Sequence, residues 1–340
     1  MTAPWEEEAE DQNIMTTLKK TKRKSMIRSI VISLGVSILT LLIVFYGAAQ
    51  LVGHLSLNVH YSEQQYMRIS SPNEFDSGYK DNRGFLSGVL EMNTYKIVDD
   101  VPIPWKTRWL NYNPWWFPFT TGAYGGVSNL TVEEPRMKQE GYEYYRNYNS
   151  DNGQREMAFY IPGVDYNGKI INDLPELYKM NGDKRVELAL SFDKDYSFEE
   201  AKSLLPTGIK QVWYWVDTYD DREGFNFKPY PNENDPAKMN YPTPMSANYG
   251  VYGFGVQPDW DQAKPEDFIG AVQTGVDKKG KYHSEYQRIF NYLKKDKAAP
   301  EAGDLRILGV VVTGTADGLK SLKDQTYVRG AVLGAVVDKY

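Results

Sequence analysis

One stretch of the chain is apolar around its whole circumference if it is helical. From Ser29 to Ala49 there is no charged residue, and Leu, Ile, Val and Phe fill most of the positions. These 21 residues would form a helix about 31 Å long, which matches the hydrocarbon core of a bilayer at about 30 Å. The pattern therefore predicts a transmembrane helix over residues 29–52, with Tyr46 at an interface position.

The charges that flank this segment predict its orientation. Six basic residues precede it, and the next basic residue after it is Arg68. They are Lys19, Lys20, Lys22, Arg23, Lys24 and Arg28. Positive residues favour the cytoplasmic side, so we expect a cytoplasmic tail at residues 1–28 and an extracytoplasmic region from residue 53 onward. The competing interpretation is a signal peptide cleaved after Gly47-Ala48-Ala49, although the apolar run is longer than is usual for such a leader.

The tail is acidic at its tip and basic near the membrane. Ile14, Met15 and Leu18 would form a short apolar stripe on a helix, and Trp5 is the other large apolar residue. These four residues are the candidate partner-binding residues. The alternative, which the composition favours, is a tail with no regular structure, made of an acidic tip and a basic membrane anchor.

Residues 53–170 form an aromatic-rich region. Strands are expected at 84–92 and 156–163. Between them, residues 103–126 contain four tryptophans and several prolines, which predicts an irregular segment. Exposed aromatic side chains of this kind suit a carbohydrate platform or a membrane-surface loop. The other interpretation is a segment packed by its own aromatic side chains against the next domain.

Residues 171–340 are predicted to be an α+β domain. Strands are expected at 186–192, 209–216, 306–314 and 327–337. A helix that begins at Ser197 joins the first two strands, and a helix at 316–323 joins the last two. Two strand–helix–strand units suggest a ferredoxin-like layout, with a sheet covered by helices on one face. Between the units we expect an irregular loop at 227–248, a short strand at 251–257 and helices at 265–276 and 282–295.

Composition excludes several functional classes. The chain has no cysteine, three histidines and a formal net charge of −6. Disulfides, thiol nucleophiles and cysteine-based metal sites are therefore excluded, and direct binding of nucleic acid is not expected. The acidic residues Asp217, Asp220 and Asp221 do not follow the EF-hand pattern. No cofactor, metal site or catalytic residue is expected, so the chain is not predicted to be an enzyme.

With these elements placed, the sequence resembles the sigma-factor regulator family. The likeness lies in the basic-flanked span KRKSMIRSIVISLGVSIL, in the block KRVELALSFDKDYSFEEAKSLLPTGIKQVWYWVDTY, in GFGVQPDW with FIGAVQTG, and in LRILGVVVTGTADGLKSLKDQTYVRGAVLGAV. The family consists of membrane-anchored anti-sigma factors of Gram-positive bacteria. The resemblance implies that the cytoplasmic segment holds an extracytoplasmic-function sigma factor and that the outer domain responds to cell-envelope stress, often with a small membrane co-regulator.

Two other functions remain open from the sequence. An anchored binding module for a cell-wall or protein ligand, with no role in sigma binding, would also have a span and an aromatic-rich outer region. An anchored hydrolase would need convergent carboxylates in a pocket. A tail of 28 residues is also shorter than family members usually carry, and an ordinary protein interface engages about 20–30 residues on each side.

Overall fold

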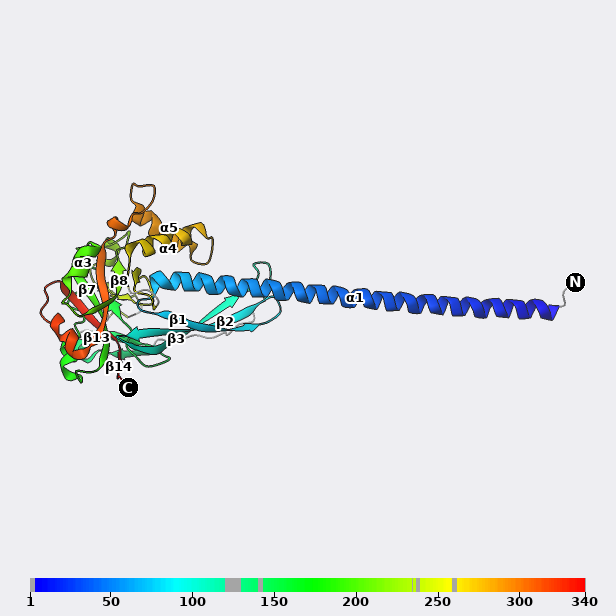
Figure 1. Ribbon diagram of the computed structural model, residues 1–340, viewed down its shortest axis with the longest axis horizontal. Coiled ribbons are helices and arrows are strands. Elements are labelled where there is room, and N and C mark those ends of the chain that lie inside the picture. Colours follow the sequence, from blue (N-terminus) through cyan, green and yellow to red (C-terminus); the bar gives the residue numbers. More distant parts are fainter. Residues whose placement is uncertain are drawn as a thin grey trace.

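A computed structural model describes residues 4–119, 130–139, 143–233, 235–236, 239–258 and 262–339; for residues 4–12 it describes the backbone only. A single helix, α1 (Pro4–Ser70), has 67 residues and projects far from the rest of the molecule (Figure 1). At 1.5 Å per residue its length is about 100 Å. The tail that composition suggested to be irregular is therefore helical. Residues 5–28 contain no glycine or proline, and Glu, Lys, Arg and Met, which favour helices, fill 12 of these 24 positions.

The helix continues beyond the predicted span and ends at Ser70, just before Ser71 and Pro72. Proline disfavours helical backbone in the residue before it, which accounts for this end point. Asn73 then adopts a left-handed conformation with φ of 53° and turns the chain back along the helix. Val52 and Met67 of this outer part are buried against the first sheet.

The first sheet is an antiparallel meander that runs back along α1 (Figure 1). Its strands are β1 (Phe75–Arg83), β2 (Gly88–Val98) and β3 (Val101–Tyr112). The strand expected at 84–92 therefore begins at Gly88, because residues 84–87 form the hairpin turn. The prediction of an irregular segment at 103–126 is wrong for residues 103–112, which belong to β3. Residues 113–119 are in no helix or strand, and residues 120–126 lie outside the described residues. Because β3 is an edge strand, Pro102 and Pro104 can lie in it with the side that lacks an N–H facing outward.

The second sheet has five antiparallel strands in the order β12-β8-β13-β7-β14. The strands are β7 (Arg185–Tyr196), β8 (Lys210–Val216), β12 (Gly253–Gly255), β13 (Ile307–Thr315) and β14 (Val328–Val337). Helix α3 (Phe198–Leu204) joins β7 to β8, and α6 (Ala316–Leu319) joins β13 to β14. Each connection passes over one intervening strand. The two predicted strand–helix–strand units are confirmed, and the region is α+β.

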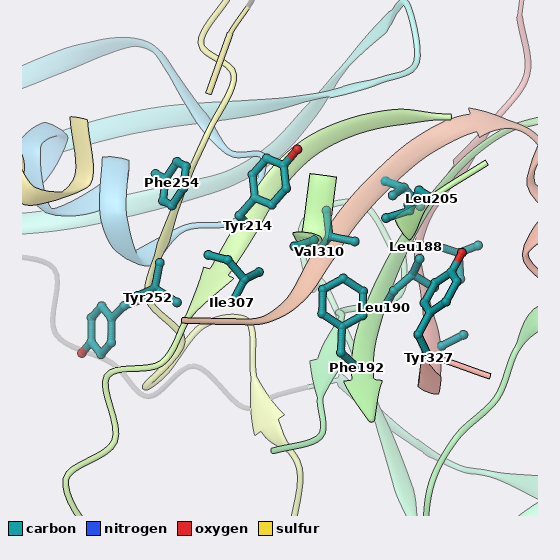
Figure 2. Packing of buried hydrophobic residues seen from close by; sticks show 14 of the residues in the cluster. Leu188, Leu190, Phe192, Leu205, Tyr214, Tyr252, Phe254, Ile307, Val310 and Tyr327 are labelled. Carbon is teal, nitrogen blue, oxygen red and sulfur yellow. The ribbon is translucent and has the colours of Figure 1, made fainter. Parts of the chain in front are cut away.

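The two faces of this sheet are covered differently. Its helical face packs against α3, α6, α4 (Pro265–Asp277), α5 (His283–Lys294) and the end of α1. Figure 2 shows Leu188, Leu190, Phe192, Tyr214 and Val310 in this core. The opposite face buries Trp215 and Val311 under residues 157–171 and 247–251. The strand expected at 156–163 is reduced to β6 (Ala158–Phe159) in this covering segment.

The remaining elements are short. They are β4 (Leu130–Glu133), α2 (Pro135–Gln139), β5 (Tyr145–Tyr148), β9 (Tyr230–Pro231), β10 (Met239–Asn240) and β11 (Met245–Ser246), with 3-10 turns at Leu174–Lys179, Glu223–Phe225, Ala302–Asp304 and Lys320–Leu322. The described residues of the segment 227–248 are otherwise irregular, as expected.

Candidate functional site

The N-terminal part of α1 presents the candidate partner-binding stripe. Ile14, Met15 and Leu18 are 55%, 58% and 59% exposed. Because residues three to four apart share a helix face, the helix brings these three side chains onto one side. The side chain of Trp5, the fourth candidate, lies outside the described residues. An apolar stripe with no cover on a helix that extends away from its own domain is a surface open to another molecule.

The apolar part of α1 is equally uncovered. Its large side chains between Ile30 and Tyr46 are about half exposed or more, and no part of its most apolar window is buried. Among the described helices, α1 is the one that is long and apolar enough to cross a membrane. A buried core helix is thus excluded for this segment, and a single-pass anchor fits it.

A cluster of charged side chains fixes the end of α1 to the first sheet. The guanidinium of Arg108 on β3 donates to Glu63 of α1 at 2.9 Å, to the Ser71 hydroxyl at 2.9 Å and to Glu74 at 2.9 Å. Lys106 also contacts Glu74, at 3.2 Å. Burial raises the pKa of Glu74, but these two cations outweigh it and lower the pKa to about 2. The helix end and its exit turn are therefore tied to one strand.

A second cluster joins the exit turn to the five-stranded sheet. Glu187 of β7 is fully buried and pairs with Lys96 of β2 at 2.9 Å. Its other oxygen accepts a hydrogen bond from Asn73 at 2.8 Å, and the backbone N–H of Ala335 lies 3.3 Å from the paired oxygen. The ammonium of Lys96 also lies 4.1 Å from the ring centroid of Trp105. This carboxylate thus links the exit turn after α1, the first sheet and the second sheet.

Aromatic side chains complete the junction on the helical side. Tyr66 of α1 stacks on Tyr282, with ring centroids 3.7 Å apart, and its hydroxyl lies 3.0 Å from that of Tyr252. Tyr282 donates a hydrogen bond to Glu63. Burial, together with the carboxylate, raises the pKa of Tyr282, so the phenol stays protonated as a donor. The end of α1 is thereby held against the start of α5.

Beside this junction lies an open cleft of about 580 Å³. Tyr66, Tyr219, Tyr252, Glu285 and Arg288 are among the residues that line it. Arg288 is engaged by Glu285 at 2.7 Å and by the carbonyl of Thr218 at 2.6 Å. Among the described residues, no three His, Asp or Glu side chains gather in a way that could hold a metal ion.

The acidic run that follows β8 is also partnered. Asp217 accepts hydrogen bonds from Arg222 and, at 2.8 Å, from Tyr292. The sequence did not reveal the two junction clusters, since bonded members are separated by up to 148 positions. The sequence signal that could have indicated the second cluster is the charged residue Glu187 within the mainly apolar strand 186–192.

The architecture is thus that of an α+β domain carried on a helix that can cross a membrane. The sigma factor regulator N-terminal family model matches residues 16–103, and the sigma factor regulator C-terminal family model matches residues 177–335. The chain belongs to the sigma factor regulator family, as its resemblance indicated, and this family is regulatory. No curated protein and no solved structure gives a significant match.

The two matched ranges correspond to structural parts. The N-terminal range covers α1 from Thr16 onward, with β1, β2 and the first residues of β3. The C-terminal range covers the five-stranded sheet and its helices. Leu18 lies inside the N-terminal range, whereas Trp5, Ile14 and Met15 precede it. The residues between the ranges include most of β3 and the segment that covers the second face of the sheet.

Proposed function

We propose that this protein is a membrane-anchored anti-sigma factor that restrains an extracytoplasmic-function sigma factor and responds to cell-envelope stress. The observation that carries the proposal is the continuity of α1. One helix joins an exposed apolar stripe, a basic flank, an apolar segment of membrane length and the base of the outer domain. Membership of the sigma factor regulator family supports a sigma factor as the partner.

In this proposal the chain divides into four parts. Residues 1–28 are the cytoplasmic tail, 29–52 the span, 53–170 the first outer region and 171–340 the C-terminal domain. The basic residues before the span support a cytoplasmic N-terminus in the cell membrane. The strand order β8-β13-β7-β14 and the two crossovers support a ferredoxin-like core in the last part. A small membrane co-regulator would have the exposed span as its contact surface.

The tail would hold the sigma factor with Trp5, Ile14, Met15 and Leu18. A helical tail of residues 4–28 extends about 38 Å, enough to lie along a groove of a folded partner. Because Ile14, Met15 and Leu18 are already exposed on a helix, binding would not require folding of the tail, which lowers its entropic cost. The sigma factor would thereby be kept at the membrane and away from RNA polymerase.

A transcription assay tests the proposal. The full chain is co-expressed with each extracytoplasmic-function sigma factor of its host, and a promoter of that sigma factor drives a reporter. We expect the chain to repress one of these reporters and its removal to raise it. The stripe variant Leu18→Asp should relieve repression, because a charge in an apolar contact is costly to bury.

Thr16→Asp is the matched control. It introduces the same charge two positions from Ile14 and from Leu18, on the opposite side of the helix. This variant should repress like the native chain, with equal amounts of both variants in the membrane fraction. If no sigma factor of the host is repressed, or if Thr16→Asp and the stripe variant behave alike, the proposed role of the tail is wrong.

A further inference from the structure

The first sheet contacts α1 in successive steps toward the membrane. Asp76 at the start of β1 bonds His60 at 2.7 Å, and Asp81 farther along accepts a hydrogen bond from Ser56 at 2.6 Å. The guanidinium of Arg83, at the end of the strand, lies against Gly53. The strand therefore descends along the helix as residue numbers on the helix fall, and each of these contacts involves polar groups.

Past Arg83 the contacts become aromatic. Phe85, in the turn between β1 and β2, packs edge-on against Phe45 of α1, with ring centroids 5.8 Å apart. Phe117 joins Phe85 at 6.5 Å, and Trp116 and Phe119 both pack against Phe117. With Trp115, the side chains Phe85, Trp116, Phe117 and Phe119 form a group that we call the aromatic tip.

The aromatic tip is exposed to an extent that is unusual for such side chains. Trp115 is 94% exposed, Phe119 is 72% exposed, and Phe85 and Trp116 are each more than half exposed. Residues 84–90 and 109–119, which carry the tip, contain no Asp, Glu, Lys or Arg. A contiguous uncharged aromatic surface of this kind on a folded domain marks a place where something other than water is bound.

The position of the tip along α1 identifies its partner. Phe45 belongs to the charge-free segment that ends at Ala49. Four residues of helix correspond to about 6 Å, so the contact between Phe45 and Phe85 lies about that far inside the apolar segment. Wherever this segment spans a bilayer, the tip has to lie at the same depth, in the boundary between headgroups and acyl chains. Tryptophan and other aromatic side chains are the residues that favour this boundary.

We propose that the aromatic tip is inserted in the membrane that α1 crosses, in the leaflet at the C-terminal end of the span. The partner is the lipid interface itself. Polar contacts as far as Arg83 lie on the water side, and the change to aromatic contacts at Phe85 marks the boundary. The inference rests on the proposed anchoring of α1 but is independent of any sigma factor. It gives the outer domain a second, direct contact with the bilayer, beside the helix.

The absence of cysteine makes the test specific, because one introduced cysteine is the only site for a spin label. The full chain is reconstituted in vesicles of phosphatidylcholine and phosphatidylglycerol, with labels in separate variants at Trp115→Cys and Phe119→Cys. Ile38→Cys reports the middle of the apolar segment. Tyr249→Cys reports water, since Tyr249 is 83% exposed beside the cleft of the outer domain. For each label, the rate of collision with oxygen is compared with the rate of collision with a water-soluble nickel complex.

We expect the labels at 115 and 119 to favour oxygen over nickel severalfold relative to the label at 249, with the label at 38 deeper still. If 38 is protected and 115 and 119 match 249, the tip is in water and this inference is wrong, while the anchoring stands. If 38 is also open to nickel, the anchoring itself fails. Protection of 115 and 119 in native membranes but not in pure lipid vesicles would assign the tip to a protein partner and overturn the lipid assignment.

Discussion

The buried pair between Lys96 and Glu187 allows a quantitative test of how the two sheets are joined. The side chains are 2% and 0% exposed, and their charged atoms lie 2.9 Å apart. Lys96→Met keeps most of the side-chain volume but removes the cation. Glu187 would then keep only its neutral donors, Asn73 and the Ala335 N–H. A buried charge that loses its ionic partner costs about 3–5 kcal/mol of stability.

The converse substitution is expected to cost at least as much. Glu187→Gln leaves the ammonium of Lys96 in the core with neutral partners, which are the amide oxygen of the new side chain and, as a cation–π contact, the face of Trp105. Such a contact contributes about 0.5–2 kcal/mol, less than a carboxylate does. The double variant, Lys96→Met with Glu187→Gln, removes both charges. It should therefore be more stable than the sum of the single losses predicts, with a coupling above about 1 kcal/mol.

The assay is urea unfolding of the full chain in detergent micelles, followed by tryptophan fluorescence. Lys80→Met serves as a matched control, because Lys80 and Glu91 form an exposed pair at 3.4 Å on the same sheet. That variant should lose less than about 1 kcal/mol. Two results would refute the reasoning: a Lys96→Met variant within about 0.5 kcal/mol of the native chain, or strict additivity in the double variant.

Three further predictions, with four substitutions, test other parts of the fold. The pKa of Glu74 is lowered from its ordinary 4.5 to about 2, so the stability that its charged form contributes is complete above pH 4.5 and is lost as the pH falls toward 2. This contribution is worth about 3 kcal/mol. Unfolding curves measured across pH should therefore show a flatter acid slope of stability for Glu74→Gln than for the native chain. Gly275→Ala on α4 should destabilise the fold by about 1–3 kcal/mol, because the added methyl group would meet the ring of Tyr286. Gly270→Ala on the same helix meets nothing and should stabilise the fold by up to about 1 kcal/mol. Equal shifts of the thermal midpoint for the two variants would contradict this packing. Ser197→Ala removes the cap that bonds the Glu200 N–H and should cost about 1 kcal/mol in chemical unfolding, with no change expected for an exposed serine elsewhere.

Local patterns predicted the second half of the molecule well. The strands at 186–192 and 306–314 are continuous apolar runs that lie at the centre of a covered sheet, where both faces are buried. Helix α3, which joins the first of these strands to β8, has Ser197 as its N-cap, and a capping box is present there. Signals of this kind are local, so the sequence states them directly. The order of the strands is not local, and it depends on which edges meet after the helices pack.

The outer part of α1 and strand β3 were missed for a different reason. Val52, Leu55 and Val59 follow a helical spacing, but Ser, His and Asn between them resemble the loop-rich region that follows. In β3 the prolines indicated a break, and only the position of this strand at a sheet edge makes them harmless. For the site, the exposed stripe was readable from spacing alone. The clusters around Arg108 and Glu187 arise from contacts between distant segments.

In the proposed function, these two clusters would limit how a stimulus can reach the tail. Arg108 holds Glu63, within α1, and Glu74, beyond its end, so the helix and its exit turn are constrained to move together. Glu187 connects that same turn, through Asn73, to the central strands of the larger sheet. A ligand can shift this arrangement only by as much as it binds one arrangement better than another. In the proposed function, a signal from the C-terminal domain would therefore reach α1 through Asn73 and through the contacts of Tyr66 and Glu63 with Tyr282, and it would move α1 as a rigid element.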